Sequence, residues 1–180
     1  MQFAEQPADI LARLEQLRAA DAPTHGGHVL SYVYDSGLAE LDELAAASIR
    51  AVQPVNGLDP TTFTSVAVME GEVVAFARDL LGGDSDVVGS VTTGGTESCL
   101  LAVKTARDLW TGSGRPRLVA PVTVHAAFHK AAHYFGLELD LVPVGQDGRP
   151  SAQAVIERLG EDVALVVVSA PSYPPAALDP

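Results

Sequence analysis

The glycine-rich segment at residues 89–98 contains residue types that bind an anion, in the order Gly-Ser-Val-Thr-Thr-Gly-Gly-Thr-Glu-Ser. The residue pattern predicts that it runs from a strand into a helix. Gly94 and Gly95 allow the backbone to approach a ligand with no Cβ in the way. The first N–H groups of the helix and its dipole favour negative charge, and the Thr96 hydroxyl adds a donor. We therefore expect an anion to bind at Gly94, Gly95 and Thr96.

Of three other interpretations of this segment, its residues argue against two and leave one open. The glycine spacing nearly matches a nucleoside-triphosphate loop, but Gly95 stands where that motif has lysine. The turn also lacks the G-x-G-x-x-G of a dinucleotide site. The third interpretation is a tight turn without ligand, capped by threonine, with Glu97 near the positive helix end. Hydroxyls of Thr93 and Ser98 are further candidate donors.

Three histidines, His125, His129 and His133, are spaced four apart in a predicted helix. This spacing can place imidazoles on one helix face for a metal, but the helix contains no Asp or Glu to complete a site, and we expect no metal. His125 differs because it stands at the junction of a strand and this helix, at the same carboxyl edge of the sheet as the glycine turn. Its alternative is a helix-start residue with its ring partly buried.

The only two lysines, Lys104 and Lys130, fall inside predicted helices, away from the expected ligand edge. We interpret them as solvated helix residues rather than nucleophiles. Cys99 is the single cysteine, which excludes a disulfide within the chain and a cysteine zinc cluster and favours a reducing, cytoplasmic setting.

Composition describes an acidic protein with a packed core. The 180 residues contain 23 acidic and 11 basic side chains, giving a net charge of −12, and 47% are hydrophobic. This charge disfavours nucleic acid and anionic membranes as partners. The most apolar stretch, at residues 163–168, is far shorter than the roughly 20 residues of a membrane span. We expect a soluble, cytoplasmic protein.

Hydrophobic periodicity predicts helices first and an alternating pattern afterwards. Helices are predicted at residues 5–20, 38–52 and 65–81, with a short apolar and aromatic segment at 29–34. After these helices, strands are predicted at 87–92, 117–121, 139–144 and 163–169, alternating with helices at 96–111, 126–135 and 152–159. The alternation predicts an α/β fold with a parallel sheet covered on both faces.

Three blocks of this chain resemble, in the same order, the sphingosine-phosphate-lyase branch of the group II pyridoxal-phosphate decarboxylases. The blocks are the glycine-rich segment, residues 125–132 (His-Ala-Ala-Phe-His-Lys-Ala-Ala) and residues 169–174 (Ser-Ala-Pro-Ser-Tyr-Pro). Upstream, residues 28–35 and 56–63 are also similar to this family, so that the resemblance covers most of the chain from about residue 25.

The resemblance implies a PLP-dependent transferase fold of the aspartate-aminotransferase type (fold type I) and a homodimer. Gly94, Gly95 and Thr96 would hold the phosphate of pyridoxal 5'-phosphate, and His125 would lie over its ring. Ser169 would lie near its phenolic oxygen. Tyr34 matches a tyrosine that approaches the active site near the dimer interface. Residues 1–82 would be a helical segment contributing to the dimer and to the edge of the active site, and residues 83–180 the first, incomplete part of the cofactor-binding domain.

The implied activity is a carbon–carbon lyase or decarboxylase acting on a phosphorylated amino alcohol or an amino acid. Two parts of such a site, the Schiff-base lysine and the aspartate that pairs with the pyridinium nitrogen, are expected beyond Pro180. Pro175 and Ala176 depart from the His-Gly common in the family, and Thr64 from its usual proline, which affects the substrate side. The alternative is a catalytically inert fragment that serves as a dimerisation or scaffold unit.

Overall fold

The computed structural model describes residues 6–29 and 34–180 of the chain. It consists of two compact units, Met1–Glu72 and Val73–Pro180. The division between them falls inside a helix, α3 (Thr64–Leu80), and the domain boundary expected at residue 82 stays a prediction.

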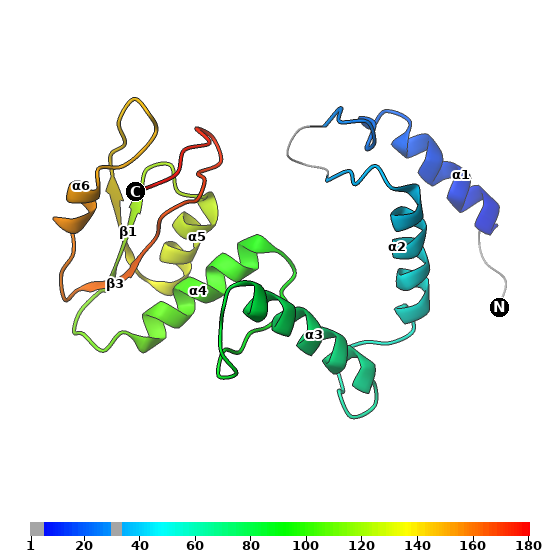
Figure 1. The fold of residues 1–180 in the computed structure, drawn as a ribbon, viewed down its shortest axis with the longest axis horizontal. Helices are drawn as coiled ribbons and strands as arrows, with labels where there is room; N and C mark the ends of the chain where they lie inside the picture. Colours follow the sequence, from blue (N-terminus) through cyan, green and yellow to red (C-terminus); the bar gives the residue numbers. More distant parts are fainter. Residues whose placement is uncertain (1–5, 30–33) are drawn as a thin grey trace. The chain divides into compact units, whose positions relative to one another are not determined.

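The first unit is helical (Figure 1). It contains α1 (Pro7–Arg18) and α2 (Ala39–Val52), and α3 begins within it. Pro7 opens α1, where its missing N–H costs no helical hydrogen bond. The three helices predicted from periodicity are confirmed to within a few residues. The predicted segment at 29–34 lies mostly outside the described residues.

The second unit is built around a parallel sheet. Its elements are α4 (Gly95–Leu109), β1 (Arg117–Pro121), α5 (Ala126–Phe135), β2 (Glu138–Val142), α6 (Ala152–Ile156) and β3 (Val163–Val166). The strand order is β2-β1-β3, and both pairings are parallel. The central Leu118 pairs with Leu139 on one side and Leu165 on the other. The predicted α/β class is therefore confirmed.

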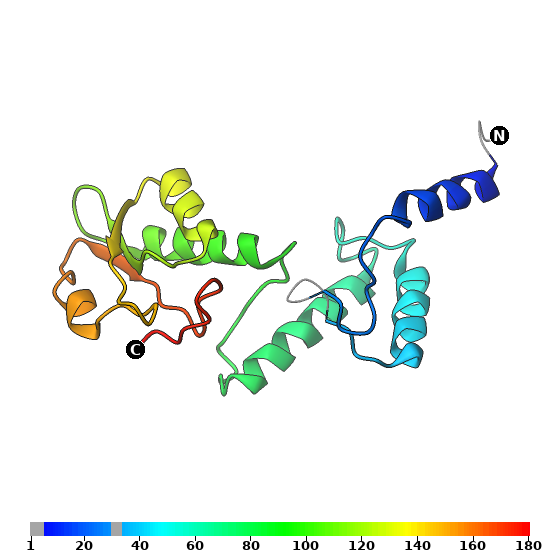
Figure 2. The same ribbon diagram turned by 90° about the horizontal axis from the view of Figure 1, so that it is seen from above.

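Helices cover both faces of this sheet (Figures 1 and 2). α4 packs against α5 and β3, and α5 packs against β2, so these two helices share one face. α6 lies on the other face. The chain crosses from β1 to β2 in one direction and from β2 to β3 in the opposite one. Two right-handed crossovers of this kind place their helices on opposite faces.

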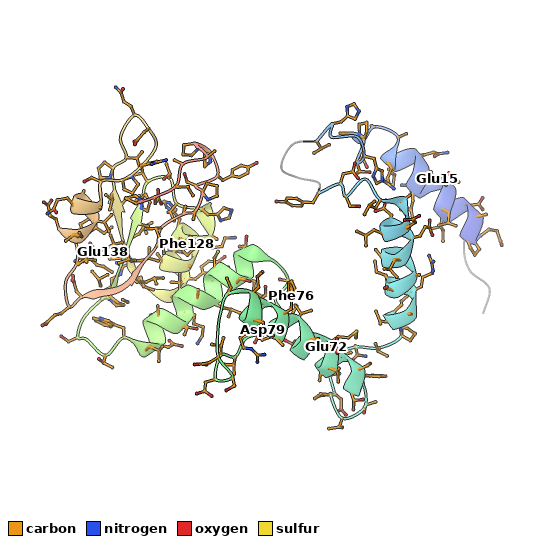
Figure 3. The ribbon with its side chains drawn as sticks, in the orientation of Figure 1. Glu15, Glu72, Phe76, Asp79, Phe128 and Glu138 are labelled. Carbon is orange, nitrogen blue, oxygen red and sulfur yellow. The ribbon has the colours of Figure 1, made fainter. Side chains whose placement is uncertain are left out.

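The core lies between the central strand and the α4–α5 layer. Leu118 of β1, Val103 of α4 and Ala131 of α5 are all fully buried. Burial of the central strand on both faces is typical of parallel sheets. Phe128 packs against this core from α5, whereas Phe76 of α3 is 71% exposed (Figure 3). The tightly packed part of the molecule is thus the part that carries the candidate site.

The strand predicted at residues 87–92 is wrong. This segment is irregular and pairs with no strand in the described part of the chain. Its valines have β propensity, but propensity alone does not make a segment a strand of a sheet. The described three-stranded sheet does not extend to it. The other predicted strands and helices are confirmed, with ends shifted by a few residues.

Charged side chains join the three strands at the amino edge of the sheet. Arg117, the first residue of β1, donates to Asp140 of β2 (2.6 Å) and, through Nε, to Asp162 just before β3 (2.7 Å). Asp140 also accepts from Arg158 Nε at 3.2 Å. The hydrogen bond and charge of Arg117 hold the pKa of Asp162 below its usual value. This cluster fixes the strands at the end opposite to the candidate site.

Candidate functional site

The N-terminus of α4 lies toward the carboxyl edge of the sheet. At its other end α4 is tied to the amino edge, because the Trp110 indole Nε1–H donates to the Glu161 carbonyl at 3.1 Å, just before β3. Since α4 packs along β3, it begins near the end at which β3 finishes. The loops after β1 and β3, which carry His125 and Ser169, leave from the same edge. Parallel α/β sheets bind their ligands at this edge.

Three backbone N–H groups in the first turn of α4, those of Gly95, Thr96 and Glu97, have no partner among the described residues. The first helical bond runs from the Ser98 N–H to the Gly94 carbonyl at 3.1 Å. A Cβ built on Gly95 meets no atom within 4 Å, so the fold itself does not require glycine there. Open space above unpaired amides is what an approaching anion needs.

Two of the three hydroxyls predicted as donors are already engaged. The Thr93 hydroxyl and N–H both donate to Glu97 Oε2, each at 2.7 Å. These bonds hold the pKa of the Glu97 carboxyl below its usual value. Ser98 Oγ lies 2.8 Å from Thr92 Oγ1. The exposed Thr96 hydroxyl has no partner in the described chain, so it is the one of the three that remains available to a ligand.

His125 is the N-cap of α5. Its Nδ1 accepts a hydrogen bond from the Ala127 N–H at 3.1 Å. An accepting nitrogen carries no proton, so in the neutral ring the proton is on Nε2, which has no partner among the described residues. The exposed ring is therefore both a structural cap and a donor at the sheet edge. The helix-start interpretation is confirmed, because His125 caps α5, but the ring is exposed rather than partly buried, and Nε2 stays available.

Ser169 follows β3 at the same edge. The last backbone bond from this segment into the sheet is from the Val167 N–H to the Val119 carbonyl at 2.9 Å. Beyond it, the Ser169 N–H donates to Asp179 Oδ2 at 2.7 Å, and the Asp179 N–H donates to the Ser169 carbonyl at 3.0 Å. The position of Ser169 is thus set by a loop contact rather than by the sheet.

The remaining predicted residues fall in two places. Tyr34 belongs to the first unit and is 94% exposed, so its approach to the site stays a prediction. Lys104 pairs with Asp108 one turn along α4, and Lys130 lies 5.9 Å from the centre of the Tyr134 ring. Both lysines are exposed helix residues, as predicted.

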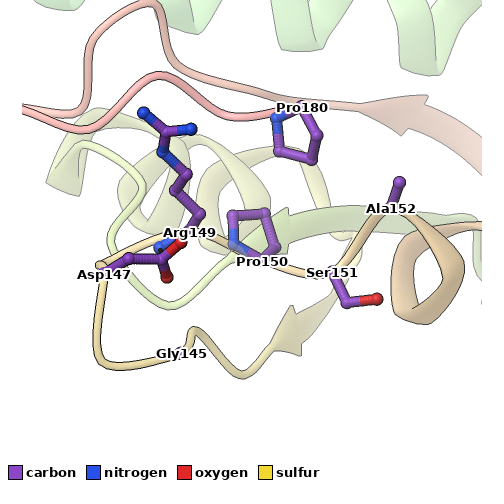
Figure 4. Close-up of a pocket in the computed structure, with 7 residues that line it drawn as sticks. All are labelled: Gly145, Asp147, Arg149, Pro150, Ser151, Ala152 and Pro180. Atoms are coloured by element: carbon purple, nitrogen blue, oxygen red, sulfur yellow. Dashed lines mark hydrogen bonds between the residues drawn. The ribbon is translucent and has the colours of Figure 1, made fainter.

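The described residues contain no group of three histidine, cysteine or acidic side chains that could hold a metal. They also contain no helix long and apolar enough to cross a membrane. A shallow hollow of about 410 Å³ lies at the turn between β2 and α6 (Figure 4). It is lined by Gly145, Asp147, Arg149, Pro150, Ser151, Ala152 and Pro180, and therefore by none of the predicted site residues.

Two contacts of acidic side chains at the site were not predicted from the sequence. They are the contact of Glu97 with Thr93 and that of Asp179 with Ser169. The position of Glu97 three residues after the N-cap Gly94 resembles a capping box, a signal that was available. Asp179 gave no such signal, because its partner Ser169 stands on the far side of a loop.

Comparison with known proteins finds related chains at the level of sequence and of structure. Mouse sphingosine-1-phosphate lyase 1 is 35% identical over 175 residues, which cover 96% of this chain and 31% of the relative. A probable L-aspartate decarboxylase of Haloarcula marismortui is 38% identical over 122 residues, covering 68% of this chain and 34% of the relative. The chain thus spans about a third of the length of these relatives. No family model matches it.

Two solved structures superpose on nearly the whole chain. Burkholderia pseudomallei sphingosine-1-phosphate lyase does so with a TM-score of 0.84 and 28% identity, over 100% of this chain and 44% of its own. Lactobacillus brevis glutamate decarboxylase does so with a TM-score of 0.74 and 16% identity, over 99% of this chain and 42% of its own. The second similarity concerns the fold alone.

The fold is that of the N-terminal portion of PLP-dependent decarboxylase and lyase chains. Within this class, the chain is a homologue of the sphingosine-1-phosphate lyases, at 34–38% identity over most of its length.

Proposed function

We propose that the protein carrying this segment is a PLP-dependent carbon–carbon lyase or decarboxylase acting on a phosphorylated amino alcohol or an amino acid. One arrangement carries the proposal: unpaired amides and the Thr96 hydroxyl at the start of α4, on the sheet edge that also bears His125 and Ser169. Homology to sphingosine-1-phosphate lyases and to an aspartate decarboxylase supports the class of reaction.

The residues present fit the phosphate of pyridoxal 5'-phosphate. The amides of Gly95 and Thr96 would hold its oxygens, with the Thr96 hydroxyl as a further donor. No Cβ occupies the space at Gly94 or Gly95, so the phosphate can approach the backbone closely. Glu97 does not compete for these amides, because its carboxylate is bound to Thr93.

His125 would lie over the cofactor ring and Ser169 near its phenolic oxygen. The Nδ1 bond to Ala127 fixes the imidazole and leaves Nε2–H as the atom that can hold or pass a proton. When bound, the cofactor supplies an electron sink for the carbanion formed at the substrate Cα. The protein residues supply orientation and charge around it.

Two substrate classes remain within this proposal. A phosphorylated amino alcohol would be cleaved by a retro-aldol step, and an amino acid would lose its carboxylate. Seven of the relatives carry the name sphingosine-1-phosphate lyase, which makes sphingosine 1-phosphate the first substrate to test and L-aspartate the second.

We also propose a cytoplasmic homodimer that binds no nucleic acid. Helices α1, α2 and α3 contain no buried residue, and large apolar side chains on them, such as Leu44 (61%) and Ile49 (67%), are exposed. Apolar surface of this kind needs a partner, and Tyr34 would belong to that interface. The net charge of −12 repels phosphate backbones. Sedimentation of the full-length protein as a monomer would contradict the dimer.

Calorimetric titration of the full-length apoprotein with pyridoxal 5'-phosphate tests the cofactor. Mass analysis of products from sphingosine 1-phosphate and from L-aspartate then tests the reaction. The proposal expects stoichiometric binding and carbon–carbon cleavage or CO₂ release with one of the two. Absence of binding contradicts it, and binding without turnover on any phosphorylated amino alcohol or amino acid would favour an inert scaffold.

A further inference from the structure

The backbone of Ser169 is held by the side chain and the backbone of one residue, Asp179. Asp179 Oδ2 accepts from the Ser169 N–H at 2.7 Å, and the Asp179 N–H donates to the Ser169 carbonyl at 3.0 Å. A charged acceptor makes the first of these bonds stronger than a neutral pairing. Both polar groups of the Ser169 backbone are thus satisfied by Asp179.

The sheet does not hold the backbone of Ser169. Its last backbone bond to this segment is made by Val167, and β3 itself ends at Val166. From that point the chain enters the loop 170–178. Without Asp179, the backbone at Ser169 would have no described partner to fix it.

The same loop has a second closure that does not involve Ser169. Ser172, buried to 1% exposure, donates to the Ala177 carbonyl through both its N–H (2.8 Å) and its hydroxyl (3.1 Å). This pair holds the outer part of the loop together. Removing this pair should therefore change the stability of the loop without changing the position of Ser169.

The second carboxylate oxygen of Asp179 lowers the stability of the fold. Oδ1 is buried and has no hydrogen-bond partner among the described residues. A buried unpaired acceptor destabilises a fold. If Asp179 only closed the loop, burying its unpaired Oδ1 would destabilise the protein with no benefit. This points to a role for the bond that Oδ2 accepts from the Ser169 N–H.

We propose that Asp179 is a positioning residue that fixes Ser169 at the cofactor edge of the sheet. This inference rests on the proposed function, in which Ser169 lies near the phenolic oxygen of pyridoxal 5'-phosphate. Asp179 acts through the Ser169 backbone and makes no contact with the cofactor itself.

The test uses the full-length protein and two readouts. Hydrogen exchange of the peptide containing the Ser169 amide measures the clamp directly, and titration with pyridoxal 5'-phosphate measures its consequence. Asp179→Ala should expose the Ser169 amide to exchange and weaken cofactor binding by about tenfold. Asp179→Asn retains an acceptor oxygen and should restore most of both.

A double-mutant cycle with Ser169→Ala separates positioning from general loosening. If Asp179 acts through Ser169, Asp179→Ala should add little to the loss of cofactor affinity in the Ser169→Ala background. Ser172→Ala is the matched control, since it loosens the same loop without touching Ser169. It should lower thermal stability and leave cofactor affinity close to that of the parent.

Three results would overturn the inference while the proposed function stands. They are parental cofactor affinity in Asp179→Ala, fully additive losses in the cycle, and an equal loss in Ser172→Ala. A parent protein that binds no pyridoxal 5'-phosphate would overturn the proposed function, and this inference with it.

Discussion

Glu97 Oε2 accepts two hydrogen bonds from Thr93, one from its N–H and one from its hydroxyl, each at 2.7 Å. The carboxylate thus satisfies the backbone just before the Gly94-Gly95 pair and leaves the amides of Gly95 and Thr96 unpaired within the described chain. An acidic residue can therefore stand in the first turn of α4 without blocking an anion. It orders the turn through its two hydrogen bonds with Thr93.

Replacing Glu97 by glutamine should remove a pH-dependent part of the stability of this turn. The bonds from Thr93 lower the pKa of Glu97 in the folded protein below its ordinary value of 4.5. The stabilisation is therefore fully present above that value and is lost as the pH falls through the lowered pKa. Thermal unfolding of the parent and Glu97→Gln, followed from about pH 7 to pH 3, should show a difference in Tm that shrinks on acidification.

Glu15→Gln in α1 is the control for that experiment, because Glu15 accepts no hydrogen bond from the described residues. A difference in Tm for Glu97→Gln that stays constant across the pH range would show that the carboxylate charge contributes nothing to the turn.

Replacing Gly95 by alanine or valine should weaken cofactor binding without unfolding the protein. A Cβ at this position meets no atom of the chain within 4 Å, but it would stand where a phosphate approaches the amides. Calorimetric titration should show a loss of about tenfold for Gly95→Ala and more for the β-branched Gly95→Val. Gly71→Ala, at a helical glycine with equally open space in α3, is the matched control. Unchanged affinity in both Gly95 variants would remove the anion site from this turn.

Much of the sheet and of the site could be predicted because their signals are local. The strand at 117–121 and the helix at 126–135 have the bounds predicted from hydrophobic pattern, and that pattern placed His125 at their junction. Helical and strand periodicities depend on residues a few positions apart, so one sequence contains them. The glycine turn was placed at a helix start for the same reason.

Other features depend on contacts between distant parts of the chain. The valines at 87–92 carry strand propensity, yet this segment is not one of the strands of the described sheet. Asp179 reaches Ser169 across a loop, and Arg117 reaches Asp162 across a crossover. Such contacts follow from topology, which the local pattern does not specify.

Replacing Arg117 by methionine should destabilise the second unit at the amino edge of its sheet. Its guanidinium side chain is only 19% exposed and contacts Asp140 of β2, Asp162 before β3 and the Arg158 carbonyl. Removing it leaves a partly buried Asp140 short of a donor, at an expected cost of about 1–2 kcal/mol. Urea unfolding followed by circular dichroism measures this loss.

Arg107→Met is the matched control, because the Arg107–Asp108 pair is solvent-exposed and joins neighbours on a single helix. Exposed pairs of this kind add little to stability. An Arg117→Met protein as stable as Arg107→Met would show that the three-strand cluster is energetically neutral. Cofactor affinity should stay unchanged in both, since the cluster lies at the edge away from the site.

His125 has two roles that different substitutions separate. As N-cap of α5 it accepts from the Ala127 N–H, and as the proposed ring-stacking residue it presents Nε2–H to the cofactor. Alanine removes both roles, whereas asparagine is a good N-cap and removes only the ring. His125→Ala should therefore lose about 1 kcal/mol of stability, and His125→Asn much less.

Turnover should fall by about a hundredfold or more in both His125 variants, the scale of a positioned acid–base group, while the thermal stability of the asparagine variant stays near that of the parent. His129→Ala and His133→Ala, at exposed positions on the same helix, should have turnover close to that of the parent. Turnover and the visible spectrum of the bound cofactor are measured for the parent and all four variants under one set of conditions. Parental turnover in His125→Asn would reduce His125 to its capping role, because the cap alone would then account for any defect of His125→Ala. A loss shared by all three histidine positions and reversed by added metal would instead indicate a metal site on this helix.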